Sequence, residues 1–268
     1  MNKISALGKV YLVGAGPGDP ELITVKGLKT LQEADVIVYD RLAVPDLLDE
    51  APEHAELIYV GKKPGRVSAS QNQINYILLQ KALEGKTVVR LKGGDPFIFG
   101  RGGEEARYLA DHGVVFELVP GISSALAAPM FAGIPLTYRN VSRSFTVITG
   151  HVQKNEEYKP DWKHLAGQDT LVVLMGMSNL AHIAHQLILH GKAPETPVAI
   201  IHKATYPDQK TVTDTLIGIA EKVKKLASPS AIVIGEVVLM AEDIAWFGQK
   251  EQLQQDLNLH PLKKTAIG

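Results

Sequence analysis

Short apolar runs alternate with stretches of helical periodicity along the first half of the chain. The runs are brief and bounded by turn residues, which predicts buried strands. The predicted strands are 10–13, 36–39, 57–60, 87–91 and 114–119. The stretches between them space their apolar residues as helices do. The predicted helices are 24–34, 71–83 and 103–111. Such a βαβ alternation is typical of a mostly parallel sheet covered by helices.

The alternation is interrupted at Pro120-Gly121-Ile122-Ser123-Ser124, a turn-rich segment that predicts a domain boundary. A helix to Phe131 is expected next, and apolar runs then recur. The predicted strands of this second half are 145–149, 171–175, 197–201 and 231–234. Its predicted helices are 180–189 and 215–226. We therefore expect two α/β domains with mostly parallel sheets, at 1–121 and 122–250, and a polar tail at 251–268.

Composition narrows the class of protein. The 268 residues have a net charge of −1 and include no cysteine. Disulfides, a thiolate nucleophile and a cysteine-zinc site are excluded, and net charge does not indicate nucleic acid or an anionic membrane as a partner. The histidines lack nearby acids that would complete a metal site, so we expect no metal. Without a signal-peptide pattern or cysteine, we expect a cytoplasmic protein.

One uncharged stretch, 119–136, is long enough to span a bilayer. Pro120, Pro129 and Pro135 interrupt it together with two glycines. Exposed irregular backbone is not tolerated in lipid. The stretch therefore predicts a buried helix bracketed by loops.

A glycine-rich turn, Gly14-Ala15-Gly16-Pro17-Gly18-Asp19-Pro20, follows the first predicted strand. Glycines there let the backbone approach a ligand closely. The dinucleotide-binding fingerprint needs glycine where this chain has Asp19, and Pro20 has no N–H to offer a phosphate. The turn therefore predicts a rigid cofactor loop that is not a pyrophosphate cradle.

Three more segments place charge at the end of a predicted strand, and two of them, 60–66 and 91–103, also contain glycine. The three segments are 39–42, 60–66 and 91–103. In open α/β sheets, ligands bind beyond the carboxyl ends of the strands, so these segments predict a binding site at that edge. All seven arginines precede residue 144, and the guanidinium fork pairs well with carboxylates and phosphates.

These segments also carry a family resemblance. The run from Val89 to Glu105, with its Gly93-Gly94-Asp95 turn, and the triplet Asp40-Arg41-Leu42 resemble the tetrapyrrole methylases. Other segments keep the order of that family. They are 14–21, 61–62, 120–124, 133–137, 149–151 and 175–177. The likeness covers about residues 8 to 247, and Ser123-Ser124 stands where the family often has Thr-Ala.

The resemblance implies two α/β domains with S-adenosylmethionine folded into the cleft between them, typically in a homodimer. It points to the members that move two methyl groups to ring carbons of uroporphyrinogen III. Their product is precorrin-2, which serves sirohaem or cobalamin synthesis, and S-adenosylhomocysteine is released. The implied partners are a small tetrapyrrole and a second copy of the chain, without metal, nucleic acid or membrane.

Family roles carried over by position give a cofactor site and an acid–base pair. The implied cofactor contacts are Pro17, Gly93, Gly94, Asp95, Ile98, Ser123, Ser124, Met175 and Ala204. Asp40 is the implied proton acceptor and Lys62 the implied proton donor. The substrate bears eight carboxylates, for which arginine forks are suitable anchors. The expected anchors are Arg41, Arg66, Arg101, Arg139 and Arg143.

The chemistry of these residues is compatible with that reaction. A pyrrole α-carbon is electron-rich and attacks a sulfonium methyl directly, so the protein must mainly align the two and exclude water. The attack leaves a cationic, iminium-like ring. A carboxylate such as Asp40 stabilises that cation and accepts the proton lost afterwards. Asp95 is suited to accept hydrogen bonds from the cofactor's amino group or ribose.

The same residues are compatible with other roles. Asp40 also lies where a dinucleotide fold places its ribose-binding acid, or it forms an ordinary ion pair with Arg41. Lys62 is equally a solvated loop lysine, and Gly93 and Gly94 are equally plain turn glycines. For the whole chain, the alternatives are another methylase of this fold, an NAD(P)-dependent oxidoreductase and a non-catalytic binding module.

Overall fold

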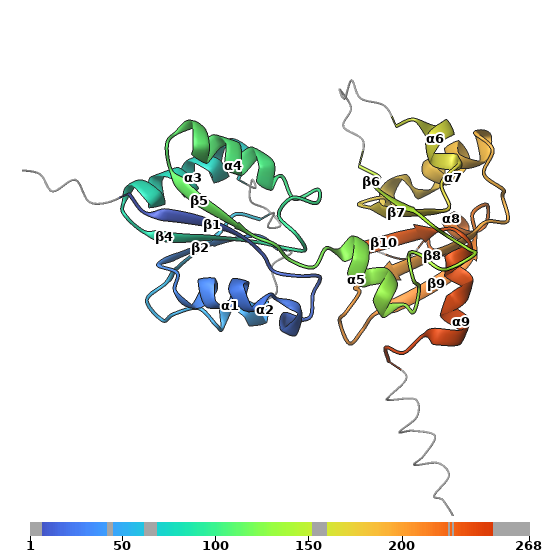
Figure 1. Cartoon of the computed structure of the whole chain (residues 1–268), viewed down its shortest axis with the longest axis horizontal. Coiled ribbons are helices and arrows are strands. Elements are labelled where there is room, and N and C mark those ends of the chain that lie inside the picture. The colour runs from blue at the N-terminus through green and yellow to red at the C-terminus, as the bar shows by residue number, and fades with distance from the viewer. Residues whose placement is uncertain are drawn as a thin grey trace, which may run out of the picture. The chain divides into compact units, whose positions relative to one another are not determined.

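The chain forms two compact units, unit 1 at Met1–Ser124 and unit 2 at Ala125–Gly268 (Figure 1). The computed structural model describes residues 7–41, 45–61, 69–151, 160–224, 226 and 228–248. Each unit has a five-stranded sheet of its own, so the predicted α/β class is confirmed. The predicted polar tail at 251–268 lies outside the described residues.

Unit 1 is built on an all-parallel sheet with the strand order β3-β2-β4-β1-β5. Its strands are β1 (Lys9–Gly14), β2 (Val36–Tyr39), β3 (Glu56–Tyr59), β4 (Thr87–Lys92) and β5 (Val115–Val119). Two helices lie on each face of the sheet (Figure 1). They are α1 (Val25–Gln32) and α2 (Pro45–Leu48) on one face, and α3 (Gln71–Leu83) and α4 (Gly102–Asp111) on the other.

Alternation along β1 gives this sheet a core on each face. Val10 and Leu12 pack with Leu78 of α3, whereas Val13 packs with Leu31 of α1. All five side chains are fully buried, and such burial stabilises the fold by about 1.5–3 kcal/mol for each side chain. Because successive side chains of a strand point to opposite faces, a sheet covered on both faces needs continuous apolar runs.

Capping residues set where α1 and α3 begin. Ser70 Oγ accepts a hydrogen bond from the Gln73 N–H (3.3 Å), and Gln73 Oε1 accepts one from the Ser70 N–H (2.7 Å). This capping box satisfies two backbone donors at the start of α3. Thr24 Oγ1 likewise accepts from the Gly27 N–H at 3.1 Å and caps α1.

The sequence pattern predicts a mostly parallel sheet in unit 2. The structure shows that this is wrong, because the sheet is mainly antiparallel. Its strand order is β6-β7-β10-β8-β9. The strands are β6 (Phe145–Thr149), β7 (Thr170–Leu174), β8 (Pro197–His202), β9 (Lys210–Thr215) and β10 (Ser230–Ile234). Only β6 and β7 pair in parallel, and the other three pairings are antiparallel.

Strands β9 and β10 account for that difference, because β10 pairs antiparallel with both β7 and β8, and β9 pairs antiparallel with β8. The connection from β8 to β9, residues 203–209, is too short for the helical crossover that a parallel pair needs. The sequence of β9, Lys-Thr-Val-Thr-Asp-Thr, lacks the apolar run that marks the other strands. The predicted helix at 215–226 is correspondingly reduced to a single turn, α8 (Ile219–Lys222).

The remaining helices of unit 2 cover both faces of its sheet. They are α5 (Ser124–Phe131), α6 (Trp162–Ala166), α7 (Leu180–Leu189) and α9 (Ala241–Ile244). Leu187 of α7 belongs to one core and Ala128 of α5 to the other. The uncharged stretch 119–136 contains α5, as expected. Among the described residues, no helix combines the length and apolar character needed to cross a membrane.

Candidate active site

The carboxyl ends of β1 and β4 are joined at one edge of the parallel sheet. The Gly94 N–H donates to the Gly16 carbonyl oxygen at 2.6 Å, and the Gly16 N–H donates back to the Gly94 carbonyl oxygen at 3.3 Å. The glycine-rich turn 14–20 and the segment 91–103 are separate in the sequence. These bonds make them one structure.

The segment that follows β5 packs directly against this junction. A Cβ atom at Gly121 would lie 2.3 Å from the Gly94 carbonyl oxygen and 2.7 Å from the Gly14 Cα atom. Both neighbours are backbone atoms, so only glycine fits at position 121. Gly94 adopts φ +67°, a left-handed conformation that favours glycine. The backbone of three loops therefore meets at these glycines.

Asp95 ties two of those loops together. Its Oδ1 atom accepts a hydrogen bond from the Phe97 N–H (2.8 Å), and its Oδ2 atom accepts one from the Gly121 N–H (3.1 Å). The sequence predicts Asp95 as a ligand of the cofactor. Each carboxylate oxygen has a second lone pair for such a ligand, but the contacts present in the structure are structural.

Seven of the nine predicted cofactor contacts belong to unit 1, and most gather at this edge. A Cβ atom at Gly94 would lie 3.8 Å from the Ser123 Cα atom and 3.7 Å from the Ser124 backbone nitrogen. Pro17 follows Gly16, which is bonded to Gly94. The contacts that share the edge are Pro17, Gly93, Gly94, Asp95, Ser123 and Ser124.

The seventh contact, Ile98, lies further along the same loop. Phe97, Ile98 and Phe99 are all exposed, and Phe99 and Arg101 have positive φ angles of 52° and 58°. Non-glycine residues adopt such angles rarely, and they cluster at functional sites. The loop after β4 therefore presents three apolar side chains to solvent on a strained backbone.

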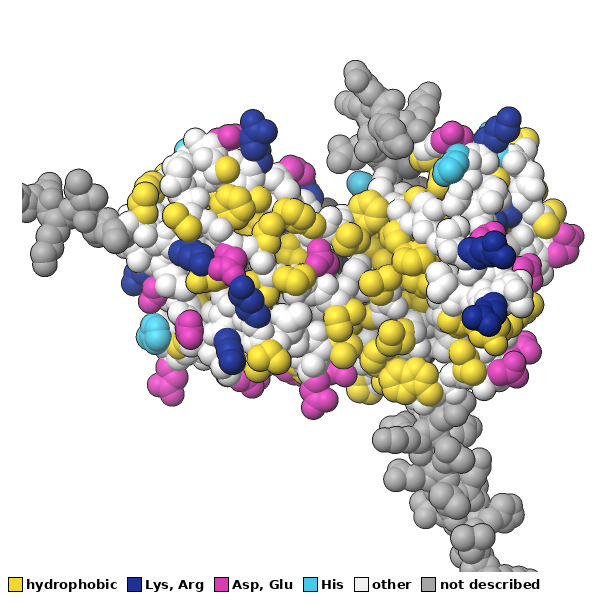
Figure 2. Space-filling view, in the orientation of Figure 1, with side chains coloured by type: hydrophobic (Ala, Val, Ile, Leu, Met, Phe, Trp, Pro, Cys, Tyr) yellow, Lys and Arg dark blue, Asp and Glu magenta, His cyan; other side chains and the backbone are white. Residues whose placement is uncertain are grey.

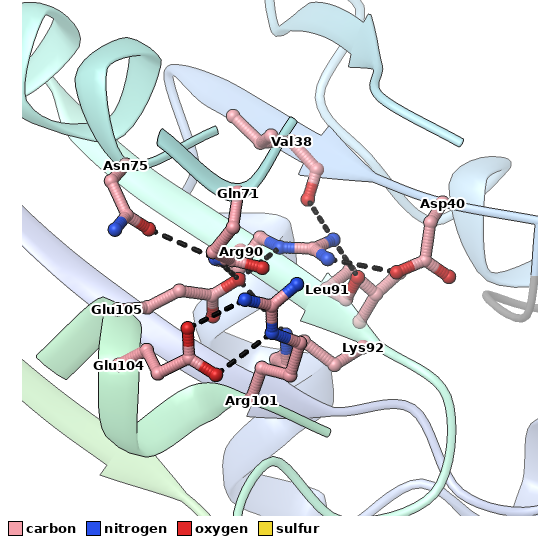
Figure 3. Close-up of polar contacts among 10 residues, drawn as sticks. All are labelled: Val38, Asp40, Gln71, Asn75, Arg90, Leu91, Lys92, Arg101, Glu104 and Glu105. Carbon is pink, nitrogen blue, oxygen red and sulfur yellow. Dashed lines mark hydrogen bonds and ion pairs between the residues drawn. The ribbon is translucent and has the colours of Figure 1, made fainter. Parts of the chain in front are cut away.

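Arg101, an expected substrate anchor, precedes α4 and is paired with a residue of its first turn. Its Nε and Nη2 atoms donate to Glu104 Oε1 (2.8 Å) and Oε2 (2.6 Å) (Figure 3). Hydrogen bonding from Arg101 lowers the pKa of Glu104. This exposed ion pair is bidentate. A substrate carboxylate would have to compete with Glu104 for the same guanidinium group.

Asp40 directly follows β2 and is held from the neighbouring strand β4. Arg90 Nη2 donates to Asp40 Oδ2 at 2.8 Å (Figure 3). The Arg90 side chain is 4% exposed and the Asp40 side chain 27% exposed. The sequence suggests Arg41 as the ion-pair partner of Asp40, but the structure assigns the pair to Arg90, because β2 and β4 are adjacent.

Behind this pair lies a buried cluster of charge. Glu105 of α4 is fully buried, and its Oε1 atom accepts from Arg90 Nε (3.2 Å), Lys92 Nζ (3.0 Å) and Gln71 Nε2 (3.2 Å) (Figure 3). Within the described part of the chain, its Oε2 atom has no hydrogen-bond partner. Burial lowers the pKa of Lys92, reinforced by the charge of Arg90 and opposed by Glu105.

The sequence gives no role to Arg90, Lys92 or Glu105. A signal is nevertheless present, because Arg90 and Lys92 are two residues apart on a strand and therefore point to the same face. Their neighbours in β4 are apolar and fully buried. Two cations in such a run require a buried anion, and Glu105 is that anion.

The other predicted anchors that the structure describes are divided between the two units. Lys62 and Arg66 lie outside the described residues. Arg41 is exposed beside Asp40 in unit 1, whereas Arg139 and Arg143 are exposed in unit 2. Each unit thus supplies part of the expected arginine set.

The last two predicted cofactor contacts follow strands of unit 2. Met175 comes directly after β7 with φ +55° and is half exposed. Ala204 follows β8 and packs against a buried core of the unit. A Cβ atom at Gly150 would lie 2.3 Å from the Gly176 Cα atom, so the ends of β6 and β7 also meet at glycines. The described residues contain no group of three side chains suited to hold a metal ion.

Comparisons with known proteins agree with this arrangement. The profile of the tetrapyrrole (corrin/porphyrin) methylases matches residues 9–220. A uroporphyrinogen-III C-methyltransferase of Priestia megaterium is 53% identical over 235 residues, which are 87% of this chain and 99% of that protein. A sirohaem synthase of Aeromonas hydrophila is 49% identical over 247 residues, 92% of this chain and 52% of that longer protein.

A solved structure gives the same result. The uroporphyrin-III C-methyl transferase of Thermus thermophilus, in complex with S-adenosylhomocysteine, superposes with a TM-score of 0.76 at 43% identity. The match covers 87% of this chain and 99% of that one.

The contact at Gly121 predicts a large effect of one methyl group. Gly121→Ala is expected to destabilise the protein by about 2 kcal/mol, because the added Cβ atom forces apart backbone that cannot yield. Chemical denaturation followed by circular dichroism measures this. Gly103→Ala is the matched control, since nothing lies within 4 Å of its Cβ position. Equal denaturation midpoints for the two variants would contradict the close approach.

Proposed function

The chain belongs to the tetrapyrrole methylase family, and we propose that it transfers two methyl groups from S-adenosylmethionine to ring carbons of uroporphyrinogen III. The product is precorrin-2, a precursor in sirohaem and cobalamin synthesis. The identity of about half the residues to a uroporphyrinogen-III C-methyltransferase, over nearly its full length, supports this reaction. The absence of cysteine is compatible with the reducing cytoplasm, where we propose that it takes place.

The observation that carries the proposal is that a carboxylate and a glycine loop lie next to each other at one edge of the sheet. Asp40 follows β2, and Gly93 follows β4, which is the adjacent strand. The sheet edge therefore presents a partly exposed carboxylate next to a glycine turn, in which Gly94 has a left-handed conformation that favours glycine. Methyl transfer to carbon needs these two elements, a surface that positions the donor and a base that takes the departing proton.

The residues at this edge fit S-adenosylmethionine. The Gly94 Cα atom faces Ser123 and Ser124, and a Cβ atom there would lie 4.0 Å from the Ser124 hydroxyl oxygen. A side chain at position 94 would thus fill the space next to two serines. Hydroxyl groups and backbone amides in this space match the ribose and amino-acid groups of the donor. When bound, the donor supplies a methyl group on a positively charged sulfur.

The chain's own part in the reaction is alignment and proton removal. The loop 93–98 and the serines 123 and 124 hold the donor, so that the pyrrole carbon attacks the methyl group in line. The new bond is carbon–carbon, and the electrons of the broken carbon–sulfur bond remain on sulfur. Asp40 then accepts the proton that the cationic ring system loses after methylation. Lys62 donates a proton to the substrate in this proposal, and the five anchor arginines bind its carboxylates.

We also propose that the protein is a homodimer. Unit 2 exposes Leu126 and Met130 on α5, and Ile244 and Trp246 near α9. Trp246 Nε1 donates to the Met130 carbonyl oxygen at 3.0 Å, so these elements are neighbours. Figure 2 shows hydrophobic side chains gathered over the part of unit 2 where α5 lies. Large apolar patches of this kind typically mark an interface.

Turnover with uroporphyrinogen III tests the proposed substrate. Under anaerobic, reducing conditions with S-adenosylmethionine, mass spectrometry is expected to find the tetrapyrrole heavier by two methyl groups. S-adenosylhomocysteine should accumulate in step. If the protein binds S-adenosylhomocysteine but methylates no tetrapyrrole, the methyltransferase class stands and the substrate is wrong. Binding of NADH in its place, measured by calorimetry, would favour an oxidoreductase.

Replacing the carboxylate tests the base. Asp40→Asn is expected to lower the rate of methyl transfer by about 10²-fold, because the amide cannot accept the proton. Affinity for S-adenosylhomocysteine should not change, since Asp40 lies on a different strand from the glycine loop. The control is Asp111→Asn, an exposed residue of α4 paired with Arg107. A wild-type rate in Asp40→Asn would exclude the role.

The apolar surface of α5 predicts the oligomeric state. Light scattering at micromolar concentration should give twice the mass of one chain, and Met130→Lys should shift the protein toward the monomer by placing a charge in the interface. Leu189→Lys is the control, because Leu189 is an equally exposed apolar residue on α7, whose core is on the other face of the sheet. A monomeric wild-type protein would refute the dimer.

A further inference from the structure

The guanidinium group of Arg90 is held by bonds on all its nitrogen atoms. Nε donates to Glu105 at 3.2 Å, Nη2 to Asp40 at 2.8 Å, and Nη1 to the carbonyl oxygens of Val38 (3.3 Å) and Leu91 (2.9 Å) (Figure 3). Two of these acceptors are backbone atoms of adjacent strands. The planar fork is therefore fixed relative to the sheet, and so is the point at which it meets Asp40.

Glu105 fixes Arg90 from the opposite side. It belongs to α4, it is fully buried, and its Oε1 atom also binds Lys92 and Gln71. Gln71 comes from α3. The position of one carboxylate at the sheet edge is thus coupled, through two buried side chains, to both helices that cover this face.

Asp40 neutralises the net charge of the buried cluster. Arg90 and Lys92 carry two positive charges and Glu105 one negative charge, so the buried part has one positive charge in excess. Asp40 balances it. Of the four side chains, those of Arg90, Lys92 and Glu105 are 4%, 5% and 0% exposed, and only that of Asp40 reaches solvent, at 27%. The cluster therefore presents one carboxylate to the outside and holds it from within.

We propose that Arg90 is the positioning residue of Asp40, with Glu105 as its support, and that methyl transfer depends on Arg90 only through Asp40. This inference rests on the proposed function of Asp40 as the proton acceptor. A base must lie within hydrogen-bond reach of the proton that it removes, and a misplacement of about 1 Å costs about 10²-fold in rate. Without Arg90, the Asp40 carboxylate loses a buried donor at 2.8 Å that helps to fix its orientation.

A double-mutant cycle tests this dependence. The single-turnover rate of the first methyl transfer is measured for the wild type, Asp40→Asn, Arg90→Met and the double variant. Arg90→Met is expected to lower the rate by about 10²-fold and to leave the affinity for S-adenosylhomocysteine within about twofold. In the Asp40→Asn background, the same substitution should lower the rate by less than about twofold, because residues that act as a unit are not additive.

Arg90→Lys separates positioning from charge. It keeps the positive charge of the cluster but cannot form the fork that reaches Asp40, Glu105 and two carbonyl groups at once. It is expected to slow methyl transfer by at least about tenfold while the protein stays folded, as circular dichroism measures. Should Arg90→Met fail to fold, Arg90→Lys takes its place in the cycle. Arg107→Met, on the exposed side of α4, is the control and should react at the wild-type rate.

The outcomes are distinguishable. Suppose that Arg90→Met or Arg90→Lys lowers the rate of methyl transfer by the same factor in the Asp40→Asn background as in the wild type. Arg90 then acts independently of Asp40, and the inference is wrong. The inference also fails if Arg90→Lys reacts at the wild-type rate, because charge alone then suffices. A wild-type rate in Asp40→Asn by itself refutes the proposed base, and the inference with it.

Discussion

Burial of Arg90, Lys92 and Glu105 is the constraint on which unit 1 depends. Removing an ion from water costs several kcal/mol even after relaxation, and the cost is offset here because one carboxylate oxygen receives three donors. The same bonds tie β4 to α3 and α4, and β4 ends at the glycine loop. The cluster also leaves one positive charge that Asp40 balances. Interior packing and the chemistry of the sheet edge therefore rest on the same contacts.

The sequence pattern predicts unit 1 closely and unit 2 less so, for a physical reason. A parallel sheet covered on both faces needs continuous apolar strands, and these are visible in the sequence. An antiparallel edge strand buries only one of its faces and therefore needs apolar residues only at alternate positions. The alternating threonines of β9 therefore give no strong signal, and the sequence pattern predicts no strand there, only a helix that begins at its last residue, Thr215. The missing β9 accounts for one antiparallel pairing, and the direction of β10 against β7 and β8 is not encoded in its apolar run.

The sequence indicates which segments form the site, but it does not indicate which of their residues are in contact. Gly94, Asp95 and Gly121 stand out in the sequence because glycine and charge follow apolar runs. Sequence spacing does not say that Gly121 touches Gly94 or that its N–H is bound by Asp95, because those contacts depend on which strands become neighbours. The alternative in which Asp40 pairs with Arg41 fails for the same reason. Arg41 is adjacent in sequence, and Arg90 is adjacent in the sheet.

Strand order also determines when each strand can pair with its neighbours during synthesis. β1 is made first, yet its partners are β4 and β5, with Lys9 opposite Thr87 and Val115. At ribosomal speeds its apolar residues wait roughly 10 s for both partners. β8 and β9, by contrast, are joined by one short connection and can pair as soon as both are made. The N-terminal strand, which leads into the glycine turn, is therefore the segment of unit 1 that the nascent chain must protect from aggregation longest.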